Sequence, residues 1–382
     1  MNNLNQEDAL QFLTGVLSVP SVNGTDGERA MAEYLYTYLN SHGIAATLQP
    51  IDDRHANVIG RIPGKSDQTV IWNGHLDTVP WGKLDEWDTD PSLPIRLGNR
   101  IYARGASDMK SGLAAMAYVC AKMAENHVVP DDTILFLGTC DEEKGGLGAE
   151  SFLSIAREEH PSFLLIGEPT GCRLGIAQKG CLWLSLSVNG KTSHGANPEE
   201  GGNALEGGFE VLRELKCYIN SFYHEILGAS TMQVTMAEGG IAPNMTPDHA
   251  RFLADIRMVP ALTRDMALHH LRRLCAEYTQ KLGGKVTFDI ELQNERMGLE
   301  IPKEDRRLRQ FEEILRSQGL PVEYSGISYF TDASILLRQF TGCPVLLYGP
   351  GDPQLCHKPN ESVDVRNYLK SLETYRSFYH RD

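Results

Sequence analysis

The sequence predicts an α/β protein, with a sheet covered by helices on both faces, and a second, inserted α+β unit. Short, continuously apolar segments alternate with helical patterns in residues 1–170 and again after residue 300, as in sheets that are buried on both faces. Between these stretches the pattern changes to strict polar–apolar alternation, which is typical of strands with one solvated face. With 382 residues the chain is also longer than one core usually supports, so two domains are expected.

The first part of the chain, residues 1–177, carries helices and buried strands in turn. Residues 27–42 have apolar positions at helical spacing and stop at Gly43, a frequent position for the end of a helix. The Ala-, Met- and Leu-rich stretch 111–124 predicts a buried helix. The remaining predicted elements are strands at 55–62, 69–72, 133–138 and 163–166 and a helix at 147–157.

The inserted unit is expected to span residues 178–292. Its first strand, LWLSLSV at 182–188, alternates strictly. Residues 293–382 then return to the earlier pattern and complete the first domain. The other predicted elements are helices at 203–217 and 263–281 and strands at 231–237, 249–258 and 285–292 in the insertion, followed by helices at 304–317 and 363–379 with a buried strand at 344–349.

Composition and charge exclude several classes of protein. A hydrophobic content of 41% and a charged content of 23% are those of an ordinary globular protein, and no apolar run approaches the roughly 20 residues that span a membrane. The net charge of −14 argues against a nucleic-acid partner, because phosphate binding needs clustered Lys and Arg. Without a secretory signal pattern or a CxxC pair, the eight cysteines are expected to be reduced thiols in a cytoplasmic protein.

Chemically reactive side chains gather where the predicted strands end. In NGHLDTVP, residues 73–80, His75 and Asp77 stand two residues apart after the strand 69–72, so both side chains point to the same side. Because ligands of open α/β sheets bind beyond the carboxyl ends of the strands, residues in such places are expected to converge. Four more motifs share this placement: RGASDMKSG with Asp108, CDEEKGG with Glu142 and Glu143, IGEPTG with Glu168, and LCHKPNE with His357.

Converging histidines and carboxylates need a compensating positive charge. Unpaired carboxylates repel one another and cost several kcal/mol each to bury, and the motifs contain few Lys or Arg residues. A pair of divalent cations would supply the charge, and this mixture of ligands suits Zn²⁺, with Co²⁺ or Mn²⁺ as possible substitutes. Taken singly, each motif also has a structural interpretation, such as acidic residues at the start of a helix. Five such motifs together favour the metal site.

These five motifs resemble those of the dinuclear zinc hydrolases of the M20 metallopeptidase family, which includes acetylornithine deacetylase, succinyl-diaminopimelate desuccinylase, aminoacylase and carboxypeptidase G. The resemblance covers the whole chain. It implies a zinc-exopeptidase-like mixed sheet flanked by helices, formed by residues 1–177 and 293–382 as the catalytic domain. It also implies that residues 178–292 act as a lid and as the surface of a homodimer. Two Zn²⁺ ions per chain and a small N-acyl amino acid or dipeptide substrate follow from the same resemblance.

The resemblance also assigns the metal ligands residue by residue. Asp108 would bridge both metals. His75 and Glu168 would complete the ligands of one metal, and Glu143 and His357 those of the other.

Two more roles follow for residues beside the ligands. Asp77 would accept a hydrogen bond from the ring N–H of His75 and so orient the imidazole. Glu142 would be the general base for a metal-bridging water and would hand its proton to the leaving amine. No Ser or Cys nucleophile is required, so Cys140 and Cys356 are interpreted as structural thiols.

Three residues of the insertion match family positions that reach the substrate. His194, in the Gly-rich loop GKTSHGANPEEGGNA, would help to hold the developing oxyanion, commonly in the active site of the other subunit. Asn244 in GGIAPNMTP and Arg257 in ADIRMVP would contact the substrate, and Arg257 would grip an α-carboxylate through two parallel hydrogen bonds. Without the resemblance, His194 is an exposed loop residue and Arg257 a strand arginine paired on the sheet face.

The implied function is hydrolysis of the amide bond of an N-acyl amino acid. A dipeptidase or carboxypeptidase of the same fold is the alternative, because the chemistry of the site is the same and only the acyl pocket differs. Tyr329 and Phe330, in the loop GISYFTDASI, have no clear alignment with the acetylornithine or diaminopimelate pattern, which leaves both of these substrates open, and an aromatic pair there would favour a larger or more apolar substrate. A non-catalytic binding protein would lack the base or a ligand, whereas Glu142 and all five ligand positions are present.

Overall fold

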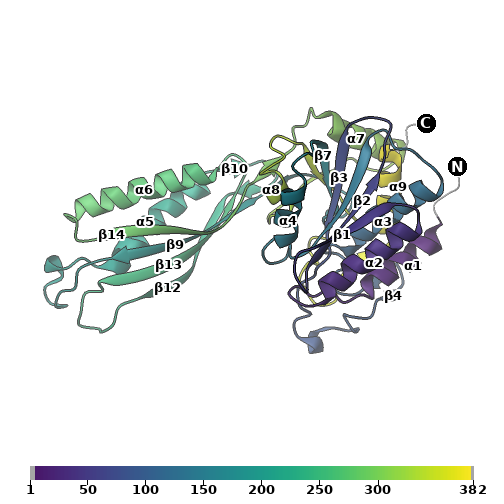
Figure 1. Cartoon of the computed structure of the whole chain (residues 1–382). Coiled ribbons are helices and arrows are strands. Elements are labelled where there is room, and N and C mark those ends of the chain that lie inside the picture. Colours follow the sequence, from purple (N-terminus) through teal and green to yellow (C-terminus); the bar gives the residue numbers. More distant parts are fainter. Residues whose placement is uncertain (1–4, 380–382) are drawn as a thin grey trace. The chain divides into compact units, whose positions relative to one another are not determined.

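The computed structural model describes residues 5–379 and divides the chain into two compact units (Figure 1). The first unit runs to Ile176 and also contains Glu300–Ser325 and the chain from Thr331 onward. The second unit consists of Ala177–Leu299 and Gly326–Phe330. The predicted insertion, residues 178–292, therefore lies inside the second unit, which extends somewhat further and takes in a short segment from later in the chain.

The main sheet is mixed, as the fold class predicts. Its strand order is β1-β2-β6-β3-β7-β17-β8-β15, with β16 paired to β8. The strands β6, β3, β7 and β17 are parallel neighbours, whereas β1, β2 and β8 pair in the antiparallel sense. The strands are β1 (Ala45–Pro50), β2 (Ala56–Ile62), β3 (Thr69–His75), β6 (Thr133–Thr139), β7 (Pro161–Ile166), β8 (Leu174–Gln178), β15 (Leu299–Glu300), β16 (Tyr324–Ile327) and β17 (Val345–Leu347).

Apolar sequence explains why the middle of this sheet is its core. All seven positions of β3 are buried, and helix α3, predicted from its Ala-rich sequence, is buried almost all round. Figure 1 shows α1, α2, α3 and α9 on one face of the sheet and α4 and α8 on the other. The helices are α1 (Gln6–Leu17), α2 (Gly27–Ser41), α3 (Lys110–Glu125), α4 (Leu147–Ile155), α7 (Arg306–Ser317), α8 (Ala333–Leu336) and α9 (Val365–Tyr379), with a 3₁₀ turn η1 at Leu84–Glu86.

Several elements have no counterpart among the predictions. Helix α1 begins where the Asn5 side chain accepts hydrogen bonds from the amides of Glu7 and Asp8, an N-cap that offsets the unpaired amides of the first turn. A three-stranded sheet of order β18-β5-β4 is built from β4 (Ile95–Leu97), β5 (Arg100–Tyr102) and β18 (Ser362–Asp364). Strands of three residues are too short for a periodic pattern to reveal.

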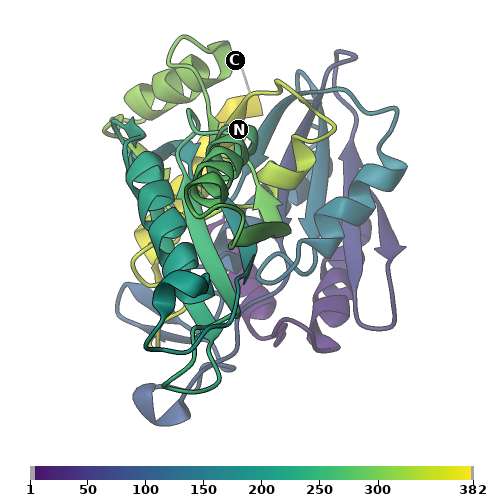
Figure 2. The ribbon, with the colours of Figure 1, turned by 90° about the vertical axis from the view of Figure 1, so that its left-hand side faces the viewer.

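The second unit is a four-stranded antiparallel sheet with helices on one face. Its order is β12-β13-β9-β14, and Figure 2 shows α5 and α6 in front of it. The alternation read in the sequence places Leu182, Leu184 and Leu186 in the core beneath these helices. The elements are β9 (Gly180–Asn189), η2 (Pro198–Glu200), α5 (Ala204–Asn220), β10 (Tyr223–His224), β11 (Gly228–Ala229), β12 (Thr231–Gly239), β13 (His249–Met258), α6 (Arg264–Lys281) and β14 (Thr287–Arg296).

Two findings bear on the predictions from composition. All eight cysteines are free thiols. Within residues 5–379, no helix combines the length and apolarity that a membrane crossing requires.

Candidate metal centre

The carboxyl ends of three parallel strands bring the motif residues of the first unit together. His75 is the last residue of β3, Glu142 and Glu143 follow the end of β6, and Glu168 follows the end of β7. Because β6, β3 and β7 are adjacent and parallel, these ends meet at one edge of the sheet. Asp108 stands just before helix α3, which begins at Lys110.

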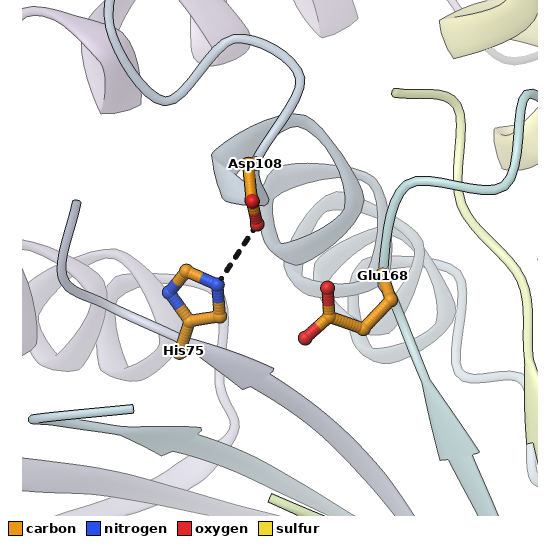
Figure 3. Close-up of side chains that lie close together, drawn as sticks. All are labelled: His75, Asp108 and Glu168. Carbon is orange, nitrogen blue, oxygen red and sulfur yellow. Dashed lines mark hydrogen bonds and ion pairs between the residues drawn. The ribbon is translucent and has the colours of Figure 1, made fainter. Parts of the chain in front are cut away.

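Asp108 lies between two histidines and offers one carboxylate oxygen to each. The Nε2 atom of His75 is 3.1 Å from Asp108 Oδ1, and the Nε2 atom of His357 is 3.3 Å from Asp108 Oδ2. His357 Nε2 is also 3.0 Å from Glu143 Oε2. Figure 3 shows His75, Asp108 and Glu168 pointing toward one another.

Two sets of three possible ligands result, and they share Asp108. One set is His75, Asp108 and Glu168, and the other is Asp108, Glu143 and His357; in each, one ligand atom per residue lies within 4.8 Å of the others. The structure thus brings together all five residues predicted as ligands, in the grouping that the family resemblance implied.

A buried oxygen tests whether this set fits a metal. Glu168 Oε2 is buried and accepts no hydrogen bond within the described part of the chain, a costly state for a carboxylate. The ion pairs that Asp108 and Glu143 form among residues 5–379 are with histidines, and none is with Lys or Arg. Imidazole nitrogens and carboxylate oxygens are donors that Zn²⁺ accepts. The residues present therefore fit a pair of divalent cations.

The pKa shifts of the proposed ligands also fit a site for cations. Burial raises the pKa of Glu168 well above its usual value, and the nearby Asp108 adds to this rise. Hydrogen bonds to Asp108 and Glu143 raise the pKa of His357 to about 10. Burial alone would lower the pKa of His75, but its contacts with Asp108 and Asp77 outweigh burial and raise it. Each of these shifts favours the protonated form of its group, and a bound cation would compete with that proton.

Asp77 contacts the centre through both its main chain and its side chain. The Nδ1 atom of His75 is 2.9 Å from the main-chain oxygen of Asp77 and 3.5 Å from its carboxylate. The carboxylate also accepts hydrogen bonds from the amides of Glu142 at 3.2 Å and Glu143 at 3.0 Å and from Asn23 Nδ2 at 2.8 Å. The nearest acceptor for the His75 ring is therefore the main-chain oxygen of Asp77. The Asp77 side chain holds the loop that carries Glu142 and Glu143.

Glu142 lies beside the ligands and is itself buried. Burial raises its pKa well above the usual value, and the charges of Glu168, Asp332 and Glu143 add to this effect while His75 opposes it. A raised pKa makes a carboxylate a stronger proton acceptor, which suits a general base.

Two buried carboxylates at the centre were not recognised in the sequence. Asp332 is 2% exposed and accepts a hydrogen bond from Thr139. Glu361 accepts hydrogen bonds from the amides of Ser107 at 2.8 Å and Asp108 at 2.9 Å. The only signal for either residue was its place in a motif already noted for another reason, GISYFTDASI for Asp332 and LCHKPNE for Glu361.

A family comparison now decides the class of protein. The model described as Peptidase family M20/M25/M40 matches residues 71–381. The chain belongs to this family. The predicted resemblance and the mixed α/β fold are thereby confirmed, and the protein is an M20 metallohydrolase.

The chain is also similar to individual proteins of known sequence or structure. An acetylornithine deacetylase of Vibrio cholerae is 28% identical and covers 92% of each chain. The crystal structure of aminopeptidase PepT from Bacillus cereus has a TM-score of 0.78 at 19% identity and covers 98% of each chain. The structure of the YXEP protein of Bacillus subtilis, called a dinuclear metal binding peptidase, has a TM-score of 0.74 at 13% identity and covers 98% of this chain and 97% of its own.

The three M20 positions predicted in the insertion all lie in the second unit. His194 is exposed, and its Nδ1 atom accepts a hydrogen bond from the amide of Ala196. The neighbouring amide of Gly195 donates to the main-chain oxygen of Asn244 at 2.8 Å, so the loops of His194 and Asn244 lie side by side. Both residues are exposed.

Arg257 lies apart from these loops, on β13. Its Nε and Nη2 atoms pair with the two carboxylate oxygens of Asp255 at 2.8 and 3.1 Å. Its guanidinium also lies 5.9 Å from the ring centre of Phe330. This is the sheet-face pairing that the sequence left open, and these two bonds use two of the five N–H donors of the guanidinium.

Proposed function

We propose that this M20 protein hydrolyses the amide bond of an N-acyl amino acid, with two Zn²⁺ ions held by the five ligands of the first unit. The observation that carries the proposal is the position of Asp108 between two ligand sets, with the buried Glu142 beside them. One shared carboxylate and two unshared ligands on each side suit a two-metal site better than a single tetrahedral one. The relationship to an acetylornithine deacetylase supports the substrate class.

Glu142 would take the proton of the attacking water and return it to the leaving nitrogen. The two cations, when bound, would polarise the scissile carbonyl and make water acidic enough to lose a proton to a carboxylate. Asp77 would keep Glu142 in reach by holding the amides of residues 142 and 143. Burial raises the pKa of the Cys140 and Cys356 thiols, which disfavours the nucleophilic thiolate at either position.

A dipeptidase or carboxypeptidase is the second candidate. Phe330 lies near two cations of the second unit, with its ring centre 5.9 Å from the Arg257 guanidinium and 5.4 Å from that of Arg296. An aromatic ring flanked by guanidinium groups would suit a carboxylate substrate with a larger or more apolar side chain. The same catalytic residues would then act on a peptide bond.

We propose further that the second unit is the lid and the surface of a homodimer. Strand β12 is the edge strand of its sheet, and along it Val234 and Met236 are 40% and 52% exposed. Phe209 on the adjacent helix α5 is 53% exposed. An exposed apolar edge of this kind is suited to pairing with a second copy. In such a dimer His194 would stabilise the oxyanion in the active site of the partner subunit.

We also propose a cytoplasmic location. The eight free thiols are consistent with this, because disulfides are rare in that compartment.

The test of the mechanism compares two neighbouring glutamates. Glu142→Gln should lower kcat by about 100-fold or more, because the amide cannot accept a proton, while both metals stay bound. Glu143→Gln should instead reduce the metal content, since it removes a ligand from one set. Elemental analysis and kcat measured on the same samples separate the two effects. If Glu142→Gln keeps more than about a tenth of the parent rate, Glu142 is not the general base.

The test of the substrate is a direct competition between the two classes. Zinc-loaded protein is assayed with N-acetyl, N-succinyl and N-formyl amino acids beside dipeptides of the same amino acids. The proposal expects a higher kcat/KM for an N-acyl amino acid than for any dipeptide. A reversed order would favour the peptidase alternative.

A further inference from the structure

The residue before the base has an unusual backbone. Asp141 has a φ of +62°, in the left-handed region that non-glycine residues seldom occupy. It stands two residues after the end of β6 and directly before Glu142 and Glu143, so its conformation sets the direction in which both glutamates leave the strand. Something in the surrounding structure must hold Asp141 in this state.

Two buried carboxylates hold three successive amides of this turn. The amide of Asp141 donates to Glu28 Oε2 at 2.8 Å, and the amides of Glu142 and Glu143 donate to the carboxylate of Asp77. Asn23 Nδ2 links the two sides, since it donates to Asp77 at 2.8 Å and to Asp141 Oδ1 at 3.2 Å. Glu28 therefore fixes the upstream end of the turn, and Asp77 fixes the downstream end.

Glu28 makes one short hydrogen bond and one longer ionic contact on its other oxygen. Its Oε1 atom accepts a hydrogen bond from the amide of Gly24 at 2.6 Å and lies 3.4 Å from His55 Nε2. The other ring nitrogen of His55 is 2.7 Å from Asp52, which completes a chain of three side chains that runs outward from the turn. Glu28 has no exposed surface, and burial together with the charge of Asp77 raises its pKa to about 7. Packing alone would be served better by an apolar side chain.

We propose that Glu28 is a positioning residue for the reaction: through the amide of Asp141 it holds the left-handed turn that aims Glu142 at the reacting atoms and Glu143 at its metal. The inference rests on the proposed function of these two glutamates. Without the carboxylate, the amide of Asp141 loses its acceptor and the residue can relax toward negative φ, which turns the two following side chains away from their places. Groups that orient ligands and bases in this way typically contribute about 10- to 100-fold to activity or metal affinity.

The test uses Glu28→Gln in the full chain loaded with Co²⁺. A glutamine keeps the shape but replaces one acceptor with a donor, so it cannot serve the amides of both Gly24 and Asp141. We expect kcat to fall by about tenfold or more while KM changes little, and the visible absorption of the bound Co²⁺ to shift because Glu143 moves. Glu28→Asp, which keeps the charge but is one methylene shorter, should change both readouts in the same direction if Glu28→Gln does not fold.

A matched control lies at the other end of the same strand. Asp132 immediately precedes β6, is 8% exposed and is paired with Arg307. Asp132→Asn removes a buried carboxylate of similar kind, so it should lower the melting temperature without changing kcat or the Co²⁺ spectrum. If Glu28→Gln behaves like Asp132→Asn, Glu28 is only structural and the inference is wrong.

A double-mutant cycle tests the link through the backbone. Glycine adopts a φ of +62° without strain, so in an Asp141→Gly background the loss of Glu28 should cost less in kcat than it does in the parent chain. Equal losses in both backgrounds would contradict action through the turn. Failure of the general-base role itself would appear separately, as an active Glu142→Gln variant.

Discussion

The residues expected to act in the reaction are held very differently in the two units. In the first unit, three of the five proposed ligands are buried: His75, Glu168 and Asp108 are 2%, 2% and 7% exposed. Glu143 is half-buried and His357 is exposed, but buried carboxylates hold the amides of the loops that carry Asp108 and Glu143. In the second unit, His194 and Asn244 are exposed, and their loops are joined to each other mainly through the main chain. In the first unit, contacts within the chain fix the side chains of most of these residues. In the second unit, they fix the loops but leave the side chains of His194 and Asn244 exposed.

This difference follows from what each set must do. Metal ligands need a fixed geometry, and strand ends backed by buried hydrogen bonds provide it. Residues that contact a substrate must let it enter and leave, and exposed loops on a stable sheet allow this. Substitutions in the first unit should therefore remove metal or chemistry, and substitutions in the second should change the transition state or the binding of substrate without removing metal.

The largest effect is expected at the shared ligand. Asp108→Asn removes the one negative charge that both ligand sets use, so both sites should lose affinity together. We expect less than one metal per chain and a fall in kcat of about 1,000-fold or more, because the general base then has no activated water. Glu168→Gln is the comparison, since it belongs to one set only and should leave the other occupied. Elemental analysis that finds two metals in Asp108→Asn would contradict the bridging role.

His194→Ala should have the next largest effect, without loss of metal. The lost donor acts on the oxyanion of the tetrahedral intermediate, so kcat should fall by about 100-fold or more while KM changes less. If the histidine serves the partner site, mixing His194→Ala chains with Glu142→Gln chains should restore activity, because one site of each mixed dimer then has both an intact base and an intact histidine. Continued inactivity after verified chain exchange would place His194 outside the partner site.

The sequence predicted the metal ligands better than the groups that hold them. His75 and Glu168 follow buried apolar strands, a pattern that is visible locally, and the parallel sheet brings such ends together whatever the loops do. Glu28 and Glu361 could not be found in this way. Glu28 acts on an amide 113 residues away and Glu361 on one 253 residues away, and locally each belongs to an ordinary helix start or turn.

Local sequence patterns also failed to predict part of the second unit. The alternation of residues 182–188 predicted strand β9, but no local signal revealed that Gly326–Phe330 returns to this unit. A segment of five residues is too short to carry a periodic pattern of its own.

Metal binding to the first unit should depend on pH, because several of its ligands have raised pKa values. Hydrogen bonds to Asp108 and Glu143 raise the pKa of His357 to about 10, and burial raises those of Glu143 and Glu168. All three groups bind a cation in their deprotonated form, so loading releases protons and acid opposes it. Below pH 10, the proton of His357 alone should weaken affinity about tenfold for each unit of pH decrease. Titrations against a competing chelator at several pH values measure this slope, and a flat profile would contradict it.

The smallest effect is expected at Arg257, and it decides between the two roles left open for this residue. If the guanidinium binds the α-carboxylate of the substrate, Arg257→Ala should raise KM about tenfold or more, as expected for a charge-assisted hydrogen bond. The increase should vanish for a substrate analogue that carries a carboxamide in place of the carboxylate. Asp255 pairs with the Nε side of Arg257, so Asp255→Asn should loosen the guanidinium and raise KM only a few-fold. If Arg257→Ala lowers the melting temperature but leaves KM unchanged for both substrates, the arginine serves only to pair with Asp255 on the face of the sheet.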